Sequence, residues 1–363
     1  MKFCEQFLFT FPCFLYAEYY YKKIYRNHED DANVVFSYGE FLIAQNRQKE
    51  AMHLFVKAFE GNQIDNGIKV RYLYNALQDE EQFKKVKPLL DTLVKVLLEK
   101  APENLNIMSL YSDVNYRIGN YKASSDILKR IIQKDESNYK AWEQMLFRQS
   151  GMDNKDTVIN YGIETIRRFE NRPLPYLMVA SAYYMKDDYR QALNFLERGE
   201  KYADSDPLKV EYYSLLAECY SKENNQELSD QFYERALKLD SVNLGILNNY
   251  AYSLAVRGDK LQMAKQMSGF TIRNDPESST FLDTYAWVLF KNKEVRKAII
   301  YIRKALEKGG NKNPEILEHY GDMMIKRGKG KKAIEIYKEA IGYGDENVRK
   351  RLEEKIIEVG KRR

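Results

Sequence analysis

Residues that usually carry chemistry are scarce in this sequence. Its 363 residues include 3 histidines, 3 cysteines and 2 tryptophans. No metal-ligand spacing and no even-numbered disulfide framework exist among the cysteines, which are Cys4, Cys13 and Cys219. No metal-ligand or catalytic-triad spacing exists among the histidines, which we expect at the surface or in a groove: His28, His53 and His319. The sequence therefore predicts no catalytic residue, no metal and no cofactor.

Turn-forming residues are also few, with 8 prolines and 18 glycines. An all-β domain of this length would need turn residues roughly every 8 to 12 positions, so helices are favoured. Hydrophobic residues make up 44% of the chain, enough for a core. The apolar run at residues 7–16 is too short to cross a bilayer, and we expect no transmembrane segment. Residues 328–332 combine glycine and lysine but lack the spacing of a phosphate-binding loop.

The charge is unevenly distributed. The net charge is +5, but from Lys291 onward 21 Lys/Arg face 12 Asp/Glu, or +9, which leaves −4 for the residues before it. Such a basic end could serve nucleic acid or an anionic membrane. However, the basic residues are interleaved with Glu at helical spacing, which is typical of a solvated helix face. Nucleic-acid binding is therefore ranked last among the functions considered.

A repeat is visible in the spacing of small residues that begin amphipathic stretches: Ala51, Ala192, Ala264, Ala298 and Ala333. Counting back from them and fitting the remaining chain gives these repeat starts: Ala32, Leu105, Tyr139, Pro173, Val210, Leu244, Ser279 and Pro314. From Leu105 onward the starts are 34, 34, 37, 34, 35 and 35 residues apart. Prolines at 102, 207 and 276 precede a start by three residues and are expected to separate helices.

Each repeat carries its own helical pattern. Position 4 is apolar, position 7 is aromatic or Leu, position 8 is small and position 11 is apolar, as in Leu282, Tyr285, Ala286 and Leu289. A second apolar stripe follows, so each repeat predicts two helices. The small residues at position 8, such as Gly39 and Gly321, would allow the two helices to approach closely.

This pattern resembles the tetratricopeptide repeat family, whose period is 34 residues. Segments 247–252 and 281–287 are similar to a bacterial subgroup that is often envelope-associated. The resemblance implies an all-α, right-handed α-solenoid of about nine antiparallel helix pairs. We expect an apolar segment and partial repeat at 1–31, a repeat array at 32–344 that is degenerate at 66–104, and a capping helix at 345–363. The compartment stays open between a periplasm-facing envelope location and the cytoplasm.

The family geometry implies a concave groove lined by the first helices of successive repeats. In the last repeats the predicted groove residues are Asn248, Tyr252, Asp283, Trp287, Phe290, Glu318, Asp322 and Lys326. In the middle they include Leu177, Ser181, Tyr184, Ser214 and Glu218. Trp287 lies off the apolar stripe of its helix; it is either a binding residue or packs on the neighbouring repeat.

The resemblance implies a non-catalytic scaffold that binds a peptide or helix of a partner protein. An alternative is a regulatory or localising part of a longer chain or complex whose activity lies elsewhere. The register of Ala17, Tyr21 and Tyr25 indicates the second helix of an earlier repeat, so residues 1–16 are a signal remnant, a cap or part of a truncated repeat. Exposed phenylalanines there predict self-association through the N-terminal end: Phe7, Phe9, Phe11 and Phe14.

Overall fold

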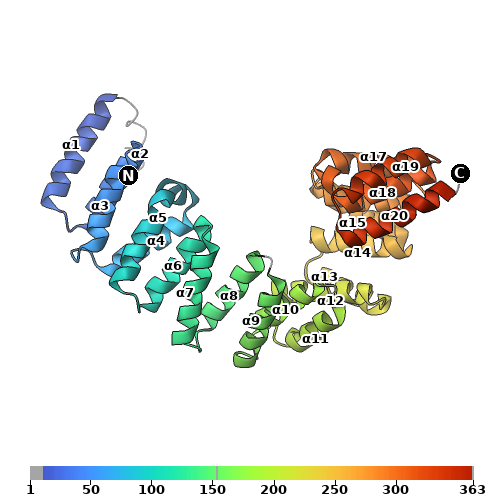
Figure 1. Ribbon diagram of the computed structural model, residues 1–363, viewed down its shortest axis with the longest axis horizontal. Coiled ribbons are helices and arrows are strands. Elements are labelled where there is room, and N and C mark those ends of the chain that lie inside the picture. The colour runs from blue at the N-terminus through green and yellow to red at the C-terminus, as the bar shows by residue number, and fades with distance from the viewer. Residues whose placement is uncertain (1–10, 153, 362–363) are drawn as a thin grey trace. The chain divides into compact units, whose positions relative to one another are not determined.

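The computed structural model describes residues 11–152 and 154–361, with side chains from residue 15 onward (Figure 1). Helices connected by short turns and loops make up those residues, which contain no strand. The protein is an all-α repeat solenoid, as the sequence predicted. Phe7 and Phe9 lie outside the described residues, as do the side chains of Phe11 and Phe14.

The chain divides into two compact units, residues 1–182 and 183–363. The helices that begin in the first unit are α1 (Phe11–Asn27), α2 (Ala32–Ala44), α3 (Gln48–Glu60), α4 (Asn66–Gln78), α5 (Glu80–Lys100), α6 (Leu105–Ile118), α7 (Tyr121–Lys134), α8 (Tyr139–Gly151), α9 (Lys155–Arg168) and α10 (Pro173–Tyr184). The second unit contains α11 (Tyr189–Glu200), α12 (Asp206–Lys222), α13 (Gln226–Leu239), α14 (Leu244–Arg257), α15 (Leu261–Asn274), α16 (Ser279–Lys291), α17 (Val295–Glu307), a 3₁₀ turn (Gly310–Lys312), α18 (Pro314–Lys326), α19 (Gly330–Ile341) and α20 (Glu346–Lys361).

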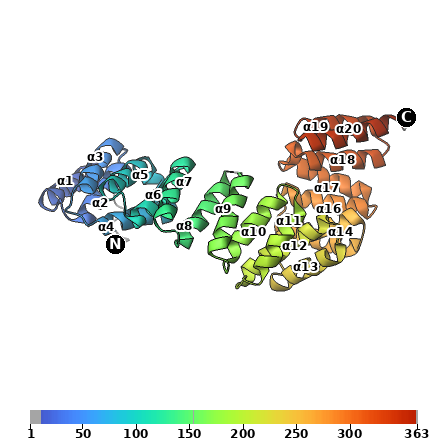
Figure 2. The same ribbon diagram turned by 60° about the horizontal axis from the view of Figure 1, so that its bottom comes forward.

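Helices α2 to α19 form nine successive pairs in the described part of the chain. Within the second unit, neighbouring helices lie side by side in chain order (Figure 2). Seven of the eight predicted repeat starts are the first residue of a helix. The exception is α12, which begins at Asp206 rather than Val210. Pro207 is therefore not a separator, because the first turn of a helix tolerates a residue without a backbone N–H.

A left-handed residue marks the same place in the repeats. Position 15, counted from each predicted start, has positive φ in the seven repeats where it is described: Asn46, Gly119, Asp187, Asn224, Gly258, Lys293 and Gly328. The left-handed conformation ends the first helix and turns the chain towards the second. The repeat that starts at Val210 keeps this register, so its earlier helix start only adds a turn at the N-terminus.

Close helix approach explains the small residue at position 8. A Cβ on Gly39 would lie 2.4 Å from Cζ of Phe55, and one on Gly321 would lie 2.2 Å from Cε1 of Tyr337. In both pairs the aromatic ring of the second helix occupies the space that a side chain would need. Glycine is therefore required by packing at these positions.

The degenerate stretch at 66–104 is still a helix pair, α4 and the long α5. Its leucines are buried in one core with α2, α3 and α6. Lys69 is fully buried there, and its Nζ donates to the carbonyls of Phe59 at 3.1 Å and Gly61 at 2.7 Å. The lysine therefore satisfies carbonyl groups at the C-terminal end of α3.

Two helices flank the pairs. On α1, Tyr21 and Tyr25 pack against Tyr38, whereas Tyr16 and Tyr20 are exposed. At the other end α20 packs on α18 and α19 and buries Leu352 completely.

Candidate functional site

The first helices of the second unit enclose a cavity of about 420 Å³. Helices α12, α14 and α16 supply most of its wall, with the end of α10, two residues of α13 and the N-terminus of α18 at its margins. Consecutive first helices contact each other from α12 through α18. The side chains that line the cavity include Tyr184, Glu218, Ser221, Lys222, Gln226, Asn248, Asn249, Tyr252, Ser253, Val256, Arg257, Thr280, Asp283, Thr284 and Glu315.

The predicted groove residues are only partly gathered here. Asn248, Tyr252 and Asp283 line this cavity, together with Tyr184 and Glu218 from the middle repeats. Phe290, Asp322 and Lys326 line a separate cavity of about 300 Å³, which α20 helps to form. Trp287 and Glu318 line neither. The sequence prediction did not name Asn249 and Ser253, which lie on α14 beside the predicted positions.

Hydrogen bonds between first helices hold the wall of the 420 Å³ cavity in place. The Asn249 amide donates to Glu218 Oε1 at 2.9 Å, which links α14 to α12. The Tyr252 hydroxyl donates to Glu315 Oε1 at 2.6 Å, which links α14 to α18. Burial raises the pKa of Tyr252 far above its usual value, and the Glu315 carboxylate raises it further. The phenol therefore keeps its proton and acts as a donor to Glu315.

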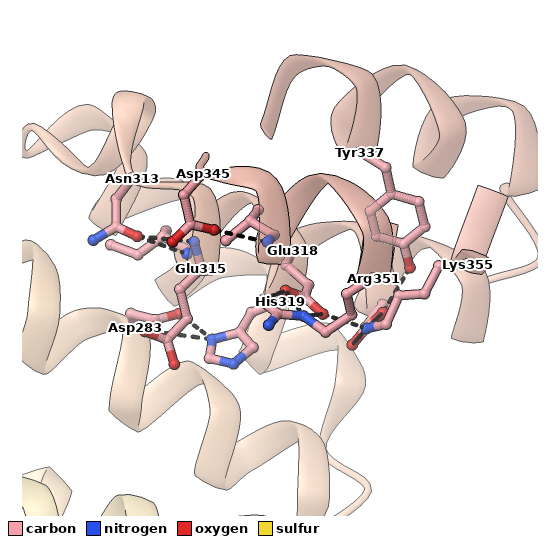
Figure 3. A network of polar contacts seen from close by, with 12 residues as sticks. Asp283, Asn313, Glu315, Glu318, His319, Tyr337, Asp345, Arg351 and Lys355 are labelled. Carbon is pink, nitrogen blue, oxygen red and sulfur yellow. Dashed lines mark hydrogen bonds and ion pairs between the residues drawn. The ribbon is translucent and has the colours of Figure 1, made fainter. Parts of the chain in front are cut away.

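His319 is buried, with 5% of its surface exposed, so the expectation of a surface or groove histidine is wrong. Its Nδ1 lies 2.9 Å from Oδ1 and 3.1 Å from Oδ2 of Asp283 on the preceding first helix (Figure 3). Burial lowers the pKa of His319, but Asp283 outweighs burial and the net direction is upward. Burial raises the pKa of Asp283, and His319 only partly offsets this. The pair therefore retains a proton more readily than the two groups would separately.

Trp287 packs on the neighbouring repeat. Its ring stacks on the His319 imidazole with centroids 4.0 Å apart and an interplanar angle of 19°. Its Nε1 is buried and has no hydrogen-bond partner among the described residues. The structure thus places Trp287 between two first helices, which is the packing arrangement that the sequence left open.

Helix α20 occupies the end of the row of first helices. Arg351 donates to Glu318 Oε2 at 2.7 Å, and Lys355 lies 2.8 Å from Glu318 Oε1 (Figure 3). Lys355 also lies 2.8 Å from Asp322 Oδ1. Tyr337 also donates to Asp322 Oδ1 at 2.6 Å. Two predicted groove carboxylates are therefore engaged by this protein's own helices.

The same kind of link recurs in the first unit. Asp113 on α6 accepts from Gln144 at 3.1 Å and from Arg148 at 2.9 Å, both on α8. The Arg148 guanidinium also lies 3.8 Å from the Tyr116 ring centroid. In both units, a carboxylate on the first helix of one repeat accepts a hydrogen bond from the first helix of the next repeat. We call these contacts the inter-repeat links.

Comparison with known sequences assigns the family. The sequence model of the tetratricopeptide repeat family matches residues 111–343. The chain belongs to the tetratricopeptide repeat family. As a tetratricopeptide repeat protein it is a scaffold of the type that mediates protein–protein interaction.

Other tetratricopeptide repeat arrays resemble this one. The type IV pilus assembly protein PilF of Pseudomonas aeruginosa is 27% identical over 180 residues, which cover 46% of this chain and 70% of that protein. A tetratricopeptide repeat protein of Parabacteroides merdae aligns with a TM-score of 0.59 at 14% identity and covers 70% of this chain and 98% of its own. The APC/C hetero-tetramer Cut9–Hcn1 aligns with a TM-score of 0.55 at 12% identity, covering 93% and 74%. The two structures share the fold.

The described residues were also compared with the requirements of a metal site and of a membrane-spanning helix. Within residues 11–152 and 154–361, no group of three His, Cys, Asp or Glu side chains is arranged to hold a metal ion. Over the same ranges, none of the helices has the length and hydropathy needed to span a bilayer.

Proposed function

We propose that this tetratricopeptide repeat array is a non-catalytic scaffold that binds a peptide segment or helix of a partner protein along the first helices of its second unit. The observation that carries the proposal is the 420 Å³ cavity, which opens between those helices and is lined by amides, hydroxyls and tyrosines. Such groups pair with the backbone and side chains of a bound segment.

The Asn248 amide supports this proposal. Asn248 is 4% exposed and lines the cavity, yet its Oδ1 has no hydrogen-bond partner among the described residues. A buried polar atom without a partner costs about 1–3 kcal/mol. A ligand that supplies a donor to this amide would recover part of that cost.

A role without catalysis is consistent with the groups near the cavity. Cys219 on α12 is the one cysteine whose side chain is described, and it is buried. Burial, together with Glu218 and Glu223, raises the pKa of Cys219 to about 12. The thiol therefore stays protonated at neutral pH and is a poor nucleophile.

The relative named a type IV pilus assembly protein suggests a context for the scaffold. We extend from that name the proposal that this chain helps to assemble a multiprotein structure. The extension rests on 27% identity over 70% of that protein's length.

Photo-cross-linking in cells tests the proposed groove. Val256 lines the cavity and is 51% exposed, whereas Ile300 on the second helix α17 is 55% exposed and does not line it. We expect a photoreactive amino acid at position 256 to cross-link a discrete partner that the same group at position 300 does not capture. Equal capture at both positions, or capture only at position 300, would place binding outside the groove.

A further inference from the structure

The charges on the wall of the 420 Å³ cavity are unbalanced. Three carboxylates line it, from Glu218, Asp283 and Glu315. Two cations line it as well, Lys222 and Arg257. The Arg257 guanidinium is already engaged, because it pairs with Asp230 and donates to Gln226 Oε1 at 2.8 Å. Lys222 is exposed, at the end of α12.

Two of the three carboxylates lack a cation. Glu218 accepts from the Asn249 amide, and Glu315 accepts from the Tyr252 hydroxyl, both of which are neutral donors. Among the residues that the structure describes, no Lys, Arg or His lies within ion-pair distance of either carboxylate. Asp283 differs, because His319 lies against it. Glu218 and Glu315 therefore face the cavity without an ion pair, although Glu315 is near enough to His319 and Arg351 to help raise the pKa of each.

This arrangement contrasts with the carboxylates farther along the same row of helices. Glu318 and Asp322 are met by Arg351 and Lys355 of α20 at 2.7–2.8 Å. In the first unit, Asp113 is met by Arg148. Glu318, Asp322 and Asp113 thus have an ion-pair partner on a neighbouring helix, whereas Glu218 and Glu315 accept only from neutral donors.

The remaining polar groups of the cavity also favour a donor. Asn248 offers a buried amide oxygen without a partner. The rings of Tyr184 and Tyr252 line the same wall, and aromatic faces attract cations. An anionic ligand would instead meet Glu218 and Glu315 at short range, which is unfavourable.

We propose that this cavity binds a lysine or arginine side chain of the partner segment, whose charged group pairs with the Glu218 or the Glu315 carboxylate. The inference rests on the proposed function and specifies the chemistry of its ligand. Hydrogen bonds to charged groups contribute more than neutral ones, so this side chain would be a principal determinant of affinity.

Peptide selection with charge substitution tests the inference without a known partner. Random dodecapeptides displayed on phage are selected against the full chain, and the enriched sequences are synthesised. Each Lys or Arg is then replaced by norleucine, which removes the charge but keeps the aliphatic chain. Affinities are measured for the wild type, a Glu218→Gln, Glu315→Gln double variant and a Glu307→Gln control, whose carboxylate is exposed on α17 outside the cavity.

We expect one norleucine substitution to weaken binding to the wild type by about tenfold or more. The double variant should lose most of that difference, while Glu307→Gln should retain it. A blocking variant, Val256→Trp, separates the two proposals. Peptides that lose binding to this variant but are insensitive to norleucine would overturn the cationic ligand and leave the groove intact. Peptides that bind wild type and Val256→Trp equally would overturn the groove itself.

Discussion

Nδ1 of His319 lies 2.9 Å from Oδ1 of Asp283, although 36 positions separate the two residues. The contact joins two successive first helices, α16 and α18. Such inter-repeat links hold neighbouring repeats together with polar contacts at the wall of the groove. They also determine which polar groups remain available to a ligand.

The His319–Asp283 link predicts an elevated histidine pKa. In a His28→Gln, His53→Gln background, the one remaining imidazole can be titrated by NMR. We expect its pKa above the ordinary value of 6.5, because Asp283 favours the protonated ring and Glu315 and Asp322 act in the same direction. When Asp283→Asn is added, the His319 imidazole stays buried but loses the carboxylate that chiefly raises its pKa. The pKa of His319 should therefore fall. An unchanged pKa in that variant would show that Asp283 does not cause the shift.

The same link predicts how the stability of the second unit depends on pH. Because the pKa of His319 is raised in the folded state, its contribution is complete below about pH 6.5 and is lost as pH rises through the higher folded value. The raised pKa of Asp283 acts in the same direction. Hydrogen exchange of α16 and α18 should therefore become faster at high pH, after correction for intrinsic rates, more in the wild type than in His319→Gln. A steeper pH dependence in the variant would contradict this sign.

Gly321 should not tolerate even one added methyl group. In Gly321→Ala the new Cβ would lie 2.2 Å from Cε1 of Tyr337, a buried ring anchored to Asp322. We expect a loss of about 1–3 kcal/mol in unfolding free energy, which denaturation followed by circular dichroism would measure. Gly245→Ala is the control, because its nearest neighbour is 3.4 Å away and alanine favours the helix. Equal stability of the two variants would refute the close-packing argument.

Removing only the cation of the Asp113–Arg148 link should destabilise the first unit more than replacing both side chains by apolar ones. The two side chains are 24% and 10% exposed, and burial raises the pKa of Asp113 despite Arg148. Arg148→Met leaves a largely buried carboxylate without its cation and should destabilise the first unit by about 3 kcal/mol. The double variant Asp113→Leu, Arg148→Met should regain most of that loss. Thermal denaturation of the wild type and both variants would measure this. A double variant that is no more stable than Arg148→Met would contradict the expectation.

The helical repeat architecture could be predicted from the sequence because each repeat carries the same local pattern of residues. The period, the small residue at position 8 and the turn at position 15 are set by contacts within one helix pair, so spacing alone located seven helix starts. The early start of α12 was missed because Pro207 was read as a separator, whereas it lies in the first turn.

The polar wall of the groove was less accessible. His319 was expected at the surface or in a groove, and its burial was missed because its partner Asp283 comes from another repeat, a contact that no local pattern encodes. Glu318 and Asp322 were assigned to the groove by position, but α20 supplies cations to them. The buried Lys69 was also missed, since its partners are backbone carbonyls that carry no sequence signal.

The most direct measurement of the central claim is the affinity of the partner captured from position 256 for two matched variants of the full chain. Val256→Trp places a bulky ring in the wall of the 420 Å³ cavity, and Ile300→Trp places the same ring at a similarly exposed position on α17. If the partner binds along the first helices of the second unit, Val256→Trp weakens binding by about tenfold or more and Ile300→Trp leaves it within about twofold. Equal affinity for both variants, or a loss confined to Ile300→Trp, would contradict the groove as the binding site.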